Sequence, residues 1–84
     1  MYATTKTPKT ILVIDDNFSV LTMIKAMLAS SDYDVAVART ADVAIWIAER
    51  KNSVDLLLME IEMSDVDGTM LAAEILTIHP NVRL

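Results

Sequence analysis

The sequence contains no cysteine, only one glycine and only two prolines among its 84 residues. Without cysteine the chain has no disulfide framework, cysteine-ligated zinc site or thiol nucleophile, which suits a reducing compartment. So little glycine and proline argues against a disordered or low-complexity chain and favours packed regular elements. We therefore expect one domain with a modest core, because a chain of this length is too short for two.

Basic residues are also scarce, since seven lysines and arginines stand against twelve aspartates and glutamates, for a formal net charge of −5. This charge does not favour nucleic-acid phosphate or an anionic membrane as a partner, and we expect neither. No stretch reaches the roughly 18 apolar residues of a membrane span, and the polar N-terminus lacks the apolar core of a signal peptide. The sequence therefore predicts a soluble, cytoplasmic protein.

Short apolar stretches alternate with segments in which apolar residues recur every three or four positions. The first pattern predicts strands and the second predicts amphipathic helices. The expected strands are 10–14, 33–38 and 56–59, and the expected helices are 18–30, 41–50 and 69–78. Residues 1–9 should form a flexible tail, and 82–84 should begin a fourth strand. Alternation of this kind predicts an α/β domain with a parallel sheet.

Acidic residues follow two of the expected strands where those strands end. Asp15 and Asp16 come after strand 10–14, and Glu60 comes after strand 56–59. Parallel sheets bind ligands beyond these C-terminal ends. Gathered carboxylates repel one another unless a cation is present, and Mg²⁺ is the usual partner. Taken singly, each acid has another explanation, as a helix cap or a solvated strand end.

The stretches ILVIDDN, YDVAVARTADVAI and DLLLMEIEMSDVDG resemble, in order and spacing, the first three motif blocks of the response-regulator receiver domains of two-component signalling. The resemblance covers residues 10–84. It implies a three-layer, doubly wound parallel sheet of flavodoxin-like topology, here truncated after the start of its fourth strand. It also implies that Asp15 and Asp16 hold Mg²⁺, that Glu62 adds a backbone carbonyl to the metal sphere, and that Glu60 occupies the phosphoacceptor position.

The chain departs from the family pattern at that position, where aspartate is usual. Ser64 also replaces a usual proline and Ala41 a usual glycine, and the family's Ser or Thr and Lys of the later strands have no counterpart up to Leu84. Glutamate carries its carboxylate one methylene too far out for in-line attack. Its single charge imitates phosphoaspartate only in part. We expect no enzymatic activity and an inert remnant of the site, with mimicry of phosphoaspartate as the less favoured alternative.

Three functions are compatible with these residues. The first is a phosphorelay receiver-like domain without a phosphoacceptor, acting through contact with a sensor kinase or an output domain. The second is a stand-alone pseudo-receiver that self-associates, because an open sheet edge predicts a homodimer joined near residues 55–59 and 78–84, with the first helix contributing. The third, a metal-dependent phosphatase, is weaker because we find no phosphate-cradling glycine loop or cationic clamp.

A few other residues invite an interpretation. Trp46 lies on a helical face that should meet water, where it either marks a contact surface or lies flat on its own helix. Met23, Met27 and Met70 suit the filling of a helix core better than the alternative, a Met-rich binding face. His79, the only histidine, lies in a loop beside a proline, so we expect a structural or an incidental role.

Overall fold

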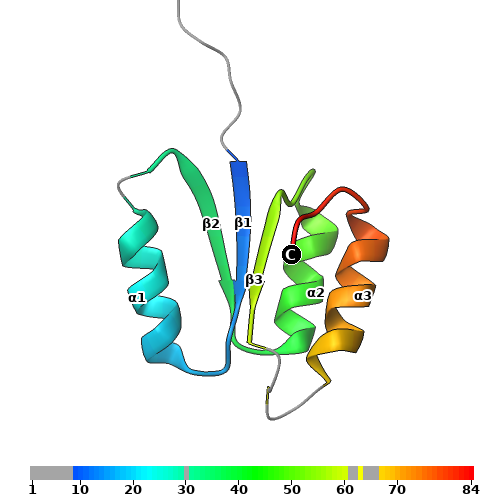
Figure 1. Cartoon of the computed structure of the whole chain (residues 1–84), viewed down its shortest axis with the longest axis horizontal. Coiled ribbons are helices and arrows are strands. Elements are labelled where there is room, and N and C mark those ends of the chain that lie inside the picture. Colours follow the sequence, from blue (N-terminus) through cyan, green and yellow to red (C-terminus); the bar gives the residue numbers. More distant parts are fainter. Residues whose placement is uncertain (1–8, 30, 61–62, 64–66) are drawn as a thin grey trace, which may run out of the picture.

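The computed structural model describes residues 9–29, 31–60, 63 and 67–84. Strands and helices alternate along these residues (Figure 1), as the sequence predicts. The elements are β1 (Lys9–Ile14), α1 (Phe18–Leu28), β2 (Tyr33–Ala38), α2 (Ala41–Arg50), β3 (Leu56–Met59) and α3 (Gly68–Ile78). β1 begins at Lys9, one residue earlier than expected, and residues 1–8 of the expected tail lie outside the described part of the chain.

The three strands form one parallel sheet in the order β2-β1-β3. β1 lies in the middle, with Ile11 paired to Val35 on one side and to Leu56 on the other. Every residue from Thr10 to Ile14 is buried, which confirms the expectation of a strand covered on both faces. The fold is the α/β, flavodoxin-like arrangement that the sequence predicts.

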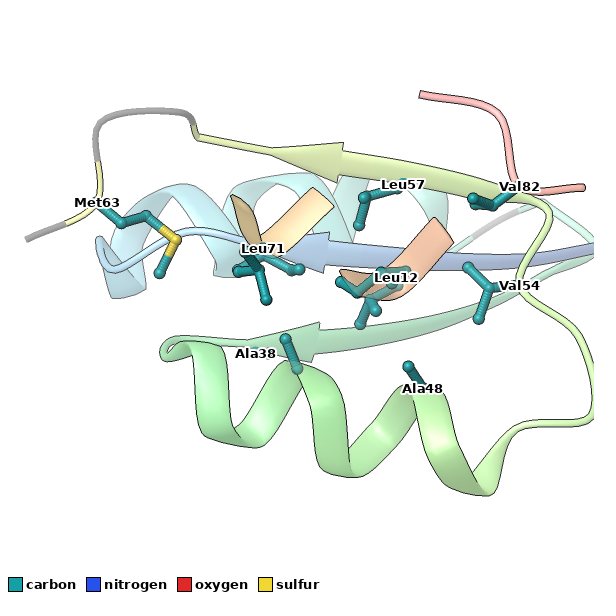
Figure 2. Packing of buried hydrophobic residues seen from close by; sticks show 11 residues of the cluster. Leu12, Ala38, Ala48, Val54, Leu57, Met63, Leu71 and Val82 are labelled. Atoms are coloured by element: carbon teal, nitrogen blue, oxygen red, sulfur yellow. The ribbon is translucent and has the colours of Figure 1, made fainter. Parts of the chain in front are cut away.

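The helices cover the two faces of the sheet unequally, with α1 on one face and α2 and α3 side by side on the other (Figure 1). Successive side chains of β1 point to opposite faces. Leu12 and Ile14 therefore join the larger core under α2 and α3 (Figure 2), while Ile11 and Val13 pack with Leu21 of α1. No helix within the described residues is long and apolar enough to cross a lipid bilayer.

Residues 82–84 begin the fourth strand that the sequence predicts. Arg83 forms a parallel bridge with Leu56. The backbone N–H of Leu57 donates to the carbonyl of Arg83 at 2.8 Å, and the N–H of Arg83 donates to the carbonyl of Asp55 at 3.0 Å. The segment thus lies beside β3, on the side away from β1.

The expected role of three methionines is wrong. Met23, Met27 and Met70 are 55%, 69% and 71% exposed instead of filling the core. Each helix packs on the sheet along a single stripe, which in α1 includes Leu21 and Ile24. Apolar residues off that stripe remain in solvent, whatever their hydrophobicity.

Candidate functional site

The backbone brings two of the predicted site residues to the same edge of the sheet. Ile14 and Met59 are the last paired residues of β1 and β3. The next residues continue the ladder, since the N–H of Glu60 donates to the carbonyl of Ile14 at 3.0 Å and the N–H of Asp15 donates to that of Ala38 at 3.1 Å. Adjacent strands lie about 4.8 Å apart. Asp15 and Glu60 therefore follow neighbouring strands at the C-terminal edge, where parallel sheets bind ligands.

The N-cap of α1 at this edge is Asn17. Its side-chain oxygen accepts from the N–H of Ser19 at 2.9 Å and of Val20 at 3.3 Å. The carboxylate of Asp15 accepts from the N–H of Asn17 at 2.8 Å and shapes the turn into α1. Asp15 and Asp16 are half-buried, whereas Glu60 is exposed. The turn thus engages one carboxylate oxygen of Asp15.

Whether this edge of the sheet suits a metal ion depends on which ligand atoms its side chains offer. No group of three or more histidine, aspartate or glutamate side chains with metal-binding geometry occurs within the described residues. Glu62, the further predicted ligand, lies outside them. Mg²⁺ prefers carboxylate oxygens and completes its shell with water, so one or two carboxylates are enough. The acids that follow β1 and β3 fit this chemistry, and their role as ligands stays a prediction.

Another acidic residue of the same edge begins α3. Asp67 is the N-cap, and its carboxylate accepts from the hydroxyl of Thr69 at 2.7 Å and from the backbone N–H of Thr69 at 2.9 Å. These two hydrogen bonds hold the pKa of Asp67 below its ordinary value of 3.8. The carboxylate is therefore charged at neutral pH and lies at the positive end of the helix dipole.

The structure assigns local roles to the two aromatic side chains singled out by sequence. Trp46 is 56% exposed, as predicted, and the guanidinium of Arg50 lies 4.0 Å from its ring centroid. A ring nitrogen of His79 lies 2.7 Å from the carbonyl of Ala48, so it donates there and joins the end of α3 to α2. This contact agrees with a structural role for His79.

The contact between Asp55 and Thr10 was not predicted from the sequence. The carboxylate of Asp55 accepts from the N–H of Thr10 at 2.7 Å, and the N–H of Asp55 donates to the carbonyl of Thr10 at 2.9 Å. The two residues stand 45 positions apart in the chain. No local sequence pattern predicts such a contact. The one sign of it in the sequence is that Asp55 stands directly before an apolar strand.

The family with the description "Response regulator receiver domain" matches residues 11–84. The chain belongs to this family. The receiver is 39% identical over 66 residues to the two-component response regulator ARR14 of Arabidopsis thaliana, an alignment that covers 77% of the chain and 17% of that relative. The chain thus spans under one fifth of the length of this curated relative.

Solved structures confirm the receiver fold. A CheY-like response regulator receiver domain protein of Methanospirillum hungatei JF-1 superposes with a TM-score of 0.83 at 29% identity, covering 90% of this chain and 60% of that one. The complex of histidine kinase ThkA with response regulator protein TrrA gives a TM-score of 0.77 at 28% identity, covering 89% of this chain and 64% of that one. The receiver is therefore a domain of two-component signalling.

Proposed function

We propose that this receiver acts through protein contact in a cytoplasmic phosphorelay and is not phosphorylated at Glu60. The observation that carries the proposal is the residue type at the end of β3. The backbone of Glu60 is held by its hydrogen bond to Ile14 at 3.0 Å, so the extra methylene of glutamate must be taken up by the side chain. Receiver domains are in general signalling modules and not enzymes, and contact alone is compatible with that role.

The length of the glutamate side chain works against chemistry at Glu60. It carries the carboxylate one methylene farther from the backbone than aspartate would. Nucleophilic attack tolerates little displacement, because a misplacement of about 1 Å costs roughly a hundredfold in rate. A glutamate on this fixed backbone is accordingly a poor nucleophile for a phosphoryl donor.

The partner that we propose is a sensor histidine kinase or an output domain. Support comes from the complex of histidine kinase ThkA with response regulator protein TrrA, a chain of which is 28% identical to this receiver. We propose no nucleic-acid partner, because the receiver carries a net charge of −5 and would repel phosphate.

Receiver domains in general bind Mg²⁺, and the acids of this edge would hold it weakly. We propose Asp15, Asp16 and Glu60 as the carboxylate ligands, with the backbone carbonyl of Glu62 as the further donor that the family resemblance implies. A bound Mg²⁺ would neutralise the repulsion among these carboxylates. The backbone N–H of Asn17 donates to the carboxylate of Asp15 at 2.8 Å, and this hydrogen bond would hold one of the ligands in place.

Intact mass spectrometry tests the proposal. The receiver is incubated with acetyl phosphate and Mg²⁺, and we expect no phosphoryl adduct. The matched control is Glu60→Asp, which restores the usual acid on the same backbone. If only this variant gains a phosphoryl group, the glutamate alone blocks the reaction. A stable adduct on Glu60 of the unaltered receiver would refute the proposal.

A second candidate is self-association, which we propose because apolar side chains gather beside the last strand. A hollow of about 520 Å³ next to α1 is lined by Leu28 of α1 and by Leu56 and Leu58 of β3. Leu58 is 37% exposed and Leu84 is 71% exposed. A homodimer joined near residues 55–59 and 78–84, with α1 contributing, would cover them.

Sedimentation equilibrium distinguishes a monomer from this homodimer. We expect a dimer in the micromolar range, and Leu84→Asp should dissociate it without unfolding the receiver, because this side chain is 71% exposed. Met70→Asp is a matched control, since Met70 is equally exposed at 71% and lies on α3, outside this contact. A well-folded species that stays at 9.3 kDa at every concentration would eliminate self-association.

A further inference from the structure

The groove between α2 and α3 is lined by two rows of side chains that have the same spacing in the sequence. The row on α2 consists of Asp42, Ile45, Trp46 and Glu49. Residues three, four and seven positions apart share one face of a helix. The α2 face of the groove therefore carries an acid near each end and an apolar pair between them.

The row on α3 repeats this arrangement with Asp67, Met70, Leu71 and Glu74. Both helices follow a parallel strand and return along the sheet in the same direction (Figure 1). The two rows consequently run parallel, with aspartates toward the helix starts and glutamates toward the helix ends. The groove between them has a volume of about 480 Å³, which is enough to receive side chains of a partner.

The middle of the groove exposes apolar surface. Leu71 is 4% exposed and belongs to the core, whereas Trp46 is 56% exposed and Met70 is 71% exposed. Large apolar side chains that gather in a groove mark an interaction site more often than scattered ones do. The guanidinium of Arg50 lies 4.0 Å from the centroid of the Trp46 ring, so one face of this ring is covered within the chain while the residue remains 56% exposed.

The ends of the groove carry negative charge that the described residues leave largely unbalanced. Arg50 lies 4.0 Å from Glu49, and no other ion pair among the described residues involves an acid of the groove. The lowered pKa of Asp67 keeps that acid charged. A partner that supplies cations at both ends and an apolar side chain between them would complement the groove.

We infer that the α2–α3 groove binds a basic amphipathic helix of a partner protein, with lysine or arginine at positions i and i+7 and apolar residues at i+3 and i+4. Seven helical residues rise about 10.5 Å, and the two acids of each row are likewise seven positions apart in the sequence. A second copy of this receiver is a poor occupant, because each copy carries a net charge of −5. The inference goes beyond the proposed function, since it uses neither Glu60 nor the other predicted magnesium ligands.

Peptide binding to the 84-residue chain tests this inference. The probe is a helical peptide of about 18 residues with lysine at i and i+7 and leucine at i+3 and i+4. The control peptide has the same composition in an order that removes this spacing. Trp46 is the only tryptophan, so its fluorescence reports the groove directly. We expect a saturable change with the probe alone, together with amide NMR shifts confined to residues 41–50 and 67–78.

Charge variants then locate the contact. Glu49→Gln and Glu74→Gln should each weaken probe binding by about two- to fivefold, the range for one exposed ion pair. Asp32→Asn is the matched control, because Asp32 is an exposed acid in the turn before β2, and it should bind like the unaltered receiver. Far-UV circular dichroism confirms that each variant is folded.

Four results would overturn the inference. The first is equal binding of both peptides, which would indicate only attraction between opposite net charges. The second is the absence of any fluorescence or amide change at millimolar peptide. The third is unaltered probe binding by both glutamine variants. If Glu74→Gln instead abolished self-association in sedimentation, a second copy would occupy the groove, and the inference would likewise be wrong.

Discussion

Asp55 joins three segments of the receiver, and its replacement by alanine should reveal how much their connection contributes to stability. Its carboxylate accepts from the N–H of Thr10 at 2.7 Å, while its own N–H and carbonyl bond to Thr10 and Arg83 at 2.9 and 3.0 Å. Asp55→Ala removes only the side-chain acceptor. Both backbone hydrogen bonds can remain, so the change isolates one interaction.

The expected loss follows from the burial of Thr10. This residue is 7% exposed, so water cannot readily replace the lost acceptor. A buried donor left without a partner costs about 1–3 kcal/mol, and hydrogen bonds to charged groups contribute about 1.5–3 kcal/mol. We therefore expect the free energy of unfolding to fall by about 2 kcal/mol. A chain of 84 residues has a total of about 4–13 kcal/mol, so the change removes a sixth to a half of it.

Urea unfolding followed by tryptophan fluorescence and circular dichroism measures this loss. Asp55→Asn is the matched control, because its amide oxygen can still accept from the N–H of Thr10, and we expect it to lose less than half as much. Hydrogen exchange at the Thr10 amide should accelerate only in the alanine variant. Equal destabilisation by both substitutions, or a loss below about 0.5 kcal/mol for alanine, would refute the reasoning.

Three other predictions follow from packing, titration and metal chemistry. Ile75→Ala, at a side chain that is 0% exposed, should lower the free energy of unfolding by about 2–5 kcal/mol in urea titration, whereas Met70→Ala on the same helix should change it by less than about 0.5 kcal/mol. The pKa of Asp67 is lowered in the folded receiver, so the stabilising effect of its carboxylate should be present above pH 3.8 and disappear as the pH falls through the lower folded value. The chemical shift of the Thr69 amide should therefore titrate with a midpoint below 3.8. A midpoint at or above 3.8 would contradict this prediction. Magnesium titration followed by amide NMR should shift residues 15–17, and no movement at tens of millimolar would rule the metal out.

The strands and helices were predictable because each has a local signal. The unbroken apolar run from Thr10 to Ile14 specifies a strand buried on both faces, and the structure buries all of it. Asp67 and Thr40 begin helices as caps, as their side-chain hydrogen bonds show. The placement of Asp15 and Glu60 at one edge also follows from sequence, since parallel strands end together.

Contacts between distant residues were not predictable in the same way. The ion pair of Lys51 with Asp34, at 2.7 Å, joins surface residues whose neighbours give no sign of it. The methionines were misjudged because hydrophobicity does not say which face of a helix meets the sheet. The groove between α2 and α3 was missed for a related reason, since it arises only when two separate rows are brought side by side.

The central position of β1 sets the order in which a newly made chain can complete its sheet. β1 is synthesised first, yet one of its edges pairs with β2 and the other with β3, which ends at Met59. Chains emerge from their N-terminus, so that second edge must wait for about 45 further residues before it finds its strand. Until then β1 has one unpaired edge, which exposes an apolar strand to pairing with another chain.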